Sequence, residues 1–281
     1  MLIGIAAIVF VIAAPTNYSD SIHDWQVNRN AKLREPDSWL TLVGLYWLKP
    51  GNNTIGSAET NDLVLPKGSA PGQVGTLRLQ GEKVLLLKTN GSSRTLSFDE
   101  DKLDVVHAGS VSFFIIKRGD KFAVRAKDSA SPTLKNFEGL KYFPINPQFH
   151  FQARFTPDEK KVPILNILGQ TEMQESPGVV EFIYRGNAYH LRPIFEGKTL
   201  FFLYKDPTNR TQTYQAGRML NTPLPADGKV DLDFNRSYNP PCTFTPYATC
   251  PLPPRENTLP FPVEAGELRY GKGHVEYTAS R

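Results

Sequence analysis

The residues best suited to chemistry gather in the last third of the chain. Asp206 ends a β-rich run just before a proline, and the segment TYQAGR follows with Thr213, Tyr214 and Arg218. The planar guanidinium of arginine grips a carboxylate with two parallel hydrogen bonds. An Arg–Asp pair here is either a structural clamp or a ligand anchor. Pairing would keep the aspartate ionised, which argues against its use as a general base.

A second polar group lies on the last predicted strand. Because successive side chains of a strand point to opposite faces, Asp231, Asp233 and Asn235 share one side, and Leu232 and Phe234 share the other. The apolar side faces the core by default. The polar side is then either a solvated surface or one wall of a pocket.

Together these segments predict one concave polar pocket near the C-terminus. Its candidate ligand-binding residues are Asp206, Thr213, Tyr214, Arg218, Asp233, Asn235, Tyr238, Asn239 and Glu267.

The pocket would be covered by a long irregular loop. Residues 239–262 hold eight prolines, which remove ladder donors and prevent a regular strand or helix. Cys242 and Cys250 lie in this loop, and a disulfide between them would stabilise the fold by about 2.5 kcal/mol. Two free thiols, or a redox or metal role, are the alternatives. A metal is not expected, since the loop contains no histidine and no C-x-x-C motif.

An enzyme using the same place is the main alternative to a binding protein. It would be a hydrolase or a thiol- or metal-dependent oxidoreductase. No G-x-S-x-G motif or glycine-rich phosphate loop is present, and no cofactor is expected. A glycosidase would need two carboxyl groups flanking a bond; the candidates are Glu172, Glu175 and Glu181 with Asp206 or Glu267.

Composition indicates a globular protein. The 281 residues are 40% hydrophobic and 21% charged, which is enough for a packed core and excludes a mainly disordered chain. The net charge of +4 comes from scattered basic residues, so nucleic acid is not an expected partner.

The N-terminus predicts export. Residues 2–14 form an apolar run that is shorter than the roughly 20 residues a membrane span needs but suits a signal-peptide core. We therefore expect residues 1–16 to be a signal peptide or an uncleaved anchor, the only membrane contact, in a secreted or cell-envelope protein. Five N-x-S/T sequons, at Asn17, Asn52, Asn90, Asn209 and Asn235, could carry glycans in a eukaryotic host.

The elements that must position these residues are mainly β. A helix is expected over residues 20–34, where Ile22, Trp25 and Leu33 share a face and Pro36 ends the pattern. The β-rich runs between turn signals are residues 39–48, 76–79, 83–88, 112–116, 122–125, 148–155, 162–168, 178–184, 187–193, 199–203 and 229–234. A boundary within residues 129–139 would divide a unit at 17–135 from one at 136–281.

The tail carries a recognisable pattern. The segments DFNRSYNPPCTFTPYATCPLPPREN, AGE and TYQAGRML, together with WLTLVGLYWLKPGNNTIGS and RAKDSASPTLKNFEGLKYFP, resemble the family of unknown function DUF1684. The combination of unusual residues at fixed spacing is specific. The resemblance implies no established activity.

The first β unit resembles forkhead-associated domains, which are β-sandwiches that bind phosphothreonine. The resemblance rests on Gly51, Ile55-Gly56, residues 61–65, Asn90-Gly91 and Gly109. The phosphate-binding residues do not match. Gly56 is followed by serine where that family has arginine, and residues 69–76 contain no histidine. The resemblance therefore implies the fold alone.

The predicted fold is thus a short N-terminal helix, a forkhead-associated-like β-sandwich, and a second β-barrel or sandwich closed by the proline-rich loop. The predicted function is binding of a small polar ligand, with an enzyme or a purely structural loop as alternatives. An enzyme predicts a carboxyl or thiol with a shifted pKa in a deep pocket. A structural loop predicts satisfied polar groups and no cavity. A binding protein predicts the pocket without the shifted acid.

Overall fold

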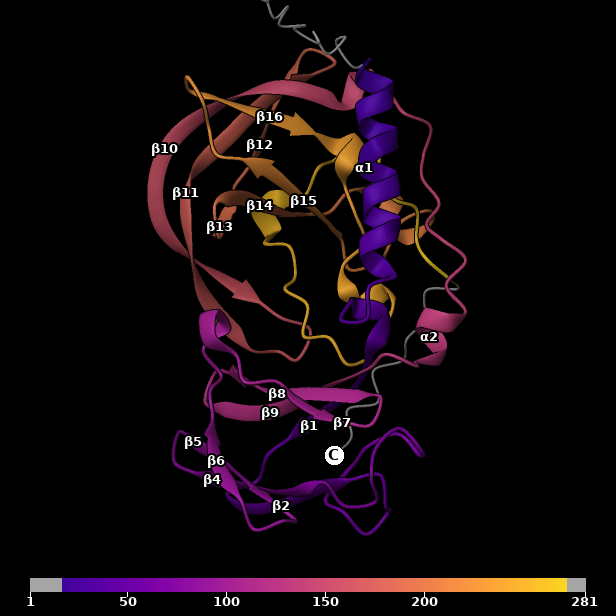
Figure 1. The fold of residues 1–281 in the computed structure, drawn as a ribbon. Helices are drawn as coiled ribbons and strands as arrows, with labels where there is room; N and C mark the ends of the chain where they lie inside the picture. The colour runs from indigo at the N-terminus through magenta and orange to yellow at the C-terminus, as the bar shows by residue number, and fades with distance from the viewer. Residues whose placement is uncertain (1–16, 272–281) are drawn as a thin grey trace, which may run out of the picture.

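Two β units lie end to end, with the long N-terminal helix beside the second unit (Figure 1). The computed structural model describes residues 17–271, so the leader predicted at residues 1–16 lies outside the described residues. None of the helices described in this range is long and apolar enough to cross a membrane.

Helix α1 (Tyr18–Leu33) confirms the predicted N-terminal helix. Asn17 caps its first turn by accepting a hydrogen bond from the Ser19 backbone N–H, and Lys32 lies in the last turn, where a cation is favourable. Ile22 and Leu33 are buried. The helix therefore packs along the second β unit.

The N-terminal unit is built from two sheets around one core. Alternate residues point inward, so Leu77 from one sheet and Phe113 and Ile115 from the other pack together, each fully buried. All pairings are antiparallel except that of β2 with β3. The sheet orders are β1(Leu42–Trp47)-β9(Lys121–Asp128)-β8(Val111–Arg118)-β7(Val106–Ala108) and β3(Leu63–Val64)-β2(Gly51–Gly56)-β4(Gly75–Gln80)-β5(Lys83–Lys88)-β6(Ser93–Leu96).

The C-terminal unit also has two sheets. They are β12(Asn187–Leu191)-β11(Thr171–Tyr184)-β10(His150–Leu165)-β16(Lys229–Asp233) and β13(Ile194–Glu196)-β14(Thr199–Tyr204)-β15(Arg218–Pro223). Each ends in edge strands, so the pairings described close no barrel, and the barrel alternative does not hold. Phe182, Phe202 and Phe234 are at most 2% exposed and form its core.

Strand β10 shows how local sequence shapes this unit. The two runs predicted at residues 148–155 and 162–168 belong largely to one strand that bends around the unit (Figure 1). Its register with β11 shifts between Pro157 and Lys160. Proline has no N–H to donate to the ladder, so an irregularity there is expected.

The proline-rich loop is ordered, as the embedded aromatics predict. Its helical turns are the short 3₁₀ segments η6 (Pro241–Thr243) and η7 (Arg255–Asn257). Asn257 donates to the backbone carbonyls of Arg192 and Leu203, both at 2.9 Å. Cys242 and Cys250 form the predicted disulfide. Thr245 donates to the Leu42 carbonyl at 2.9 Å, so the loop joins the two β units.

Candidate functional site

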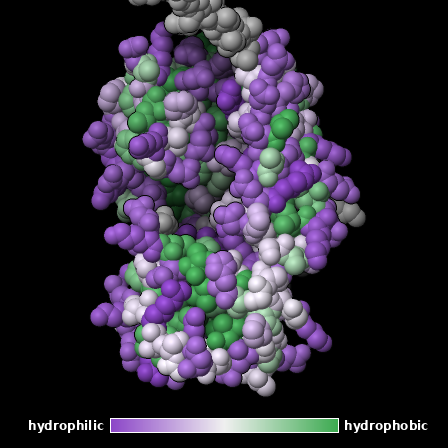
Figure 2. Space-filling view, in the orientation of Figure 1, coloured by the Kyte–Doolittle hydropathy of each residue, from purple (hydrophilic) through white to green (hydrophobic). Residues whose placement is uncertain are grey.

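A cleft opens between the two β units. It consists of two adjoining cavities of about 410 Å³ and 390 Å³, which share Arg118, Glu196, Phe201, Thr249 and Pro251 in their walls. The space-filling view shows the surface hollowed near mid-height, with hydrophobic residues visible inside and hydrophilic residues at the rim (Figure 2). The size suits a small organic molecule.

The N-terminal wall of the cleft carries two arginines that meet at one hydroxyl. Arg118 ends β8 and Arg125 lies on the neighbouring strand β9. Arg118 Nε and Arg125 Nη2 each donate to Thr249 Oγ1 at 3.2 Å. Arg125 is only 7% exposed, and its guanidinium lies 5.5 Å from the centre of the Trp39 ring. Because a hydroxyl has two acceptor sites and one proton, Thr249 can still donate to a third group.

The C-terminal wall supplies neutral and acidic groups. Tyr238 donates its hydroxyl proton to Asn221 Oδ1, and Asn221 Nδ2 donates to Glu196 Oε2 at 2.6 Å. Burial, reinforced by the charge of Glu196, raises the pKa of Tyr238, so the phenol stays neutral. The Arg29 guanidinium lies 4.8 Å from the Tyr238 ring centre.

Behind this wall lies a fully buried carboxylate, Glu267. It accepts from Arg29 Nε at 2.8 Å and from the backbone and side-chain nitrogens of Asn239 at 2.7 and 3.0 Å. Asn239 Nδ2 also donates to the Leu268 carbonyl at 2.7 Å. Two acceptors on Nδ2 fix the amide orientation, so Oδ1 must point the other way. Asn239 Oδ1 is buried without a hydrogen-bond partner among the described residues, and Asn239 lines the cleft.

Arg218 forms an Arg–Asp pair, whose aspartate the sequence did not specify; the partner is Asp206, and the pair is a clamp. Arg218 Nη2 lies 2.7 Å from Asp206 Oδ2, and both side chains have no exposed surface. Arg218 also donates to the carbonyls of Ala265 and Val263, which ties the tail to β15. The cavity beside Arg218 and Tyr214 is about 10 Å³, room for no more than a water molecule.

Thr213 supports the same clamp. Its hydroxyl accepts from Asn209 Nδ2 at 2.8 Å. Asn209 Oδ1 in turn accepts from the backbone N–H of Asp206 in a capping box.

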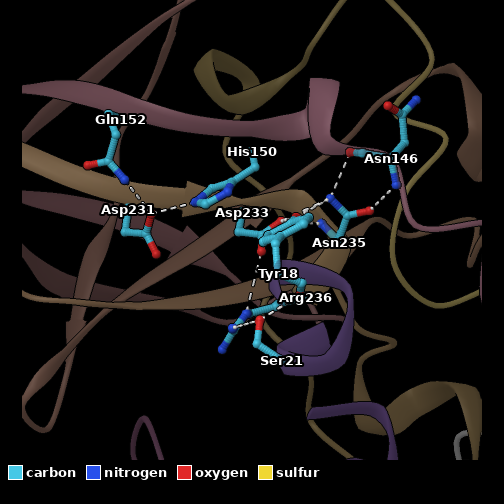
Figure 3. A network of polar contacts seen from close by, with 9 residues as sticks. All are labelled: Tyr18, Ser21, Asn146, His150, Gln152, Asp231, Asp233, Asn235 and Arg236. Carbon is cyan, nitrogen blue, oxygen red and sulfur yellow. Dashed lines mark hydrogen bonds and ion pairs between the residues drawn. The ribbon is translucent and has the colours of Figure 1, made fainter. Parts of the chain in front are cut away.

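A network of polar contacts around Tyr18, Asp233 and Asn235 joins helix α1 to β16 (Figure 3). Tyr18 donates to Asp233 Oδ1 at 3.0 Å, and Asn235 Nδ2 donates to the Tyr18 hydroxyl at 2.9 Å and to the Asn146 carbonyl at 2.9 Å. His150 stacks on the Tyr18 ring with centres 5.0 Å apart. Burial, reinforced by Asp233, raises the pKa of Tyr18.

This network corrects the expectation of a solvated strand face. The Asp231 side chain is 52% exposed and contacts His150 at 2.6 Å, but Asp233 and Asn235 are only 3% and 2% exposed. The reason is that β16 ends at Asp233, and the turn η5 (Phe234–Arg236) carries Asn235 under α1. The sequons at Asn209 and Asn235 are likewise buried, so a glycan at either is incompatible with the fold.

The predicted pocket residues therefore divide among several places. Tyr238 and Asn239 line the cleft, and Glu267 holds Asn239 from behind. Asp206 and Asp233 line neither part of the cleft, so the expected convergence of Asp206, Arg218, Asp233 and Asn239 on one cavity is wrong. Each acid is instead matched by donors within its own packed region.

Most residues of the cleft carry no signal in the sequence. Arg29, Arg118, Arg125, Glu196 and Thr249 come from segments far apart along the chain, which fold topology alone brings together. The available signal was weak: the quoted family segments contain Arg125 and Thr249, but no short spacing relates them.

The other candidate acids also separate. Glu172 lines the cleft, whereas Glu175 does not, and Glu181 faces His190 and Arg154 on the sheet surface. Hydrogen bonds from His190 and Arg154 lower the pKa of Glu181. Among the side chains that the structure describes, no group of three or more from His, Cys, Asp or Glu could hold a metal ion.

Comparisons with known proteins agree with the pattern in the tail. The solution NMR structure of the uncharacterized protein from gene locus rrnAC0354 of Haloarcula marismortui is 30% identical in sequence, with a TM-score of 0.41. That match covers 48% of this chain and 78% of the archaeal one. No curated protein matches the chain. Residues 135–268 match the model described as protein of unknown function (DUF1684), and the chain belongs to this family.

Proposed function

We propose that this protein binds a small polar ligand in the cleft between its two β units. The observation that carries the proposal is the cleft itself. Its volume falls in the usual range for ligand sites, and polar groups from α1, from β8 and β9, and from the proline-rich loop all border it. A purely structural loop would leave no such space.

The buried amide of Asn239 supports the same conclusion. A buried acceptor without a donor is costly, and native proteins keep few of them. Asn239 Oδ1 is such an acceptor, in a residue that lines the cleft. A ligand that carries an O–H or N–H group would satisfy it.

The carboxyl groups with a shifted pKa lie outside the cleft. The described carboxyl groups with a shifted pKa are Asp62, Asp158 and Glu181, and hydrogen bonds lower the pKa in each case. None of the three lines the cleft. None of these three is therefore a candidate general acid or base for the cleft.

Trp39 provides a direct test, because it is the tryptophan that borders the cleft. A variant with Trp25→Phe and Trp47→Phe leaves Trp39 as the single emitter among the three tryptophans of the chain. Titration with a library of small polar compounds should give a saturable change in emission, since a bound ligand replaces water beside the indole.

The matched control keeps only Trp25, through Trp39→Phe and Trp47→Phe. Trp25 lies on α1 against Tyr142, away from the cleft. Compounds that act at the cleft should leave its emission unchanged. No saturable response at Trp39 for any compound, or equal responses at the two positions, would contradict the proposal.

We also propose that the protein works outside the cytoplasm, as a secreted or envelope protein. The apolar run at residues 2–14 and the disulfide between Cys242 and Cys250 support this, because disulfides persist in oxidising compartments. N-terminal sequencing of the mature protein and alkylation of cells before reduction test it. An intact leader together with two alkylated cysteines would oppose it.

For the N-terminal unit we propose a forkhead-associated-like sandwich without phosphothreonine binding, within a division of the chain near residues 129–139. The two sheets that share one core support the sandwich. An experimental structure of residues 17–135 that failed to superimpose on forkhead-associated domains would reject it.

A further inference from the structure

The geometry around Thr249 points to the ligand's chemistry. Resting on the cleft-binding function proposed above, we propose that the ligand carries an oxyanion, a carboxylate or a phosphate monoester, which binds between Arg118 and Arg125. Its apolar part then lies against Phe201 in the shared wall of the cleft.

The first argument is the convergence of two cations. Arg118 Nε and Arg125 Nη2 donate to the same oxygen, Thr249 Oγ1, so two positive groups are held close together beside a cavity. Like charges at short range repel, and the repulsion is stronger where burial reduces the effective dielectric constant. Arg125 is 93% buried, since its exposed fraction is 7%. An anion placed beside Arg118 would be attracted by both guanidiniums.

The second argument is the unused donor capacity of Arg118. Its Nε binds Thr249, and its Nη1 donates to the Lys117 carbonyl at 2.8 Å. Among the side chains that the structure describes, no carboxylate lies within ion-pair distance of Arg118, and its Nη2 donates to no acceptor. A guanidinium with free, coplanar N–H groups is matched to the two oxygens of a carboxylate or phosphate.

The opposite wall orients the ligand. Glu196 and Glu172 line the cleft from β13 and β11 of the C-terminal unit. Their charges repel an oxyanion from that wall and direct it toward Arg118 and Arg125. The apolar side chains of Ile164, Ile194 and Phe201 lie in the same part of the cleft and favour an aliphatic or aromatic body.

Three probes of similar size separate the possibilities: benzoate, phenyl phosphate and the neutral benzamide. Each is titrated into the single-Trp39 protein and by calorimetry into the full chain. Charge-assisted hydrogen bonds are about twice as strong as neutral ones. The dissociation constant of benzoate or of phenyl phosphate should therefore be at least about tenfold lower than that of benzamide. The tighter of the two anions identifies a carboxylate or a phosphate as the natural group.

Arg118→Gln should weaken binding of the preferred anion by about tenfold and leave benzamide unchanged. Arg210→Gln is the matched control. It removes the same charge from an exposed position on η4 (Pro207–Arg210) outside the cleft, and anion affinity should stay within about twofold. Arg118→Lys keeps the charge but loses the planar N–H donors of the guanidinium. Its affinity for the anion should lie between those of the wild type and Arg118→Gln.

The outcomes separate the two proposals. Equal binding of benzamide and the anions, unaffected by Arg118→Gln, would overturn the oxyanion inference and leave cleft binding intact. No saturable response from these probes or from the compound library would overturn both. If Arg118→Gln fails to fold, Thr249→Val, which removes the oxygen on which both arginines converge, must also change anion affinity relative to Thr249→Ser, or the inference fails.

Discussion

Two arginine sites in this molecule use the same side chain in opposite ways. At Arg218 the guanidinium meets Asp206 and two backbone carbonyls, and the surrounding space holds at most one water. At Arg118 and Arg125 two guanidiniums meet one hydroxyl beside a cavity of several hundred Å³. The first site is complete within the protein.

The difference teaches that a buried charge pair and a polar cleft have different consequences for stability and binding. Removing one partner of a sealed pair leaves a charge without compensation. Removing a cation from a solvated wall leaves water in its place. Substitutions at the two sites should therefore separate an effect on folding from an effect on ligand affinity.

The largest effect is expected at the clamp. Asp206→Asn should lower the free energy of unfolding by about 3–5 kcal/mol, because Arg218 would stay charged and buried without its counterion. Urea denaturation of the two proteins at pH 7 measures it. Glu196→Gln, an acid-to-amide change on the exposed rim of the cleft, is the control and should change stability by about 0.5 kcal/mol or less.

A loss below about 1 kcal/mol for Asp206→Asn would show that the clamp is not sealed. Replacing both members, through Asp206→Leu with Arg218→Met, should recover part of the loss, since no unpaired charge remains. If the double variant were less stable than the single one, the hydrogen bonds to the tail rather than the charges would govern the region.

The disulfide comes second. Cys242 and Cys250 close a short ring, and the double change to alanine should lower the unfolding free energy by about 2.5 kcal/mol. Thr249 directly precedes Cys250, so loss of the disulfide should also loosen the position of Thr249 in the cleft wall. Ligand binding, followed as the saturable change in Trp39 emission, should then be weaker. Denaturation together with the emission assay measures both, and dithiothreitol on the wild-type protein provides an independent check. Unchanged stability and unchanged ligand response would show that the loop is held by its other contacts.

The sequence was informative where a rule is local. The capped helix at α1, the strands between turn signals, the ordered proline-rich loop and the Cys242–Cys250 pair each follow from neighbouring residues. An Arg–Asp pair at Arg218 was also expected, but the sequence did not say which aspartate would form it. Strand β15 was not predicted, because its segment was interpreted as a site and not as structure.

The cleft could not be predicted because its geometry depends on packing between distant segments. Arg118 lies between the predicted runs 112–116 and 122–125, and Arg125 ends the second run, so neither position indicated a site. Their contact with Thr249 depends on where the proline-rich loop folds. The solvated-face expectation failed at Asp233 because α1, more than 200 positions away in sequence, covers it through Tyr18. Alternation along a strand cannot indicate what lies on top of it.

Alkaline pH probes the sealed region on a smaller scale. Tyr204 is fully buried, 5.1 Å beneath the Arg218 guanidinium, and burial raises the pKa of its phenol above the ordinary 10.0. Above pH 10 the unfolded chain loses this proton while the folded chain keeps it, so the unfolded state binds fewer protons and stability falls as pH rises. Below pH 10 both states keep it and the contribution is constant.

Each such tyrosine contributes a slope of up to about 1.4 kcal/mol per pH unit. Tyr204→Phe should remove one such slope from the dependence of the unfolding free energy on pH between about pH 10 and 12. Loss of the hydrogen bond to Ser237 should lower the unfolding free energy by the same amount at every pH. Tyr46, whose pKa burial raises to about 12, stays in the variant as the matched tyrosine of the other unit. Unfolding free energies measured at several pH values decide it. An unchanged slope would mean that hydroxide reaches Tyr204 in the folded protein.

The smallest effect on stability is expected at Arg118, the cleft arginine that contrasts with Arg218. Arg118→Gln should change the unfolding free energy by about 0.5 kcal/mol or less, because Arg118 forms no ion pair in the described chain and Thr249 retains its bond from Arg125. Urea denaturation without ligand measures this change in the unfolding free energy. A loss approaching that of Asp206→Asn would place Arg118 among the structural arginines and remove the distinction between the two sites.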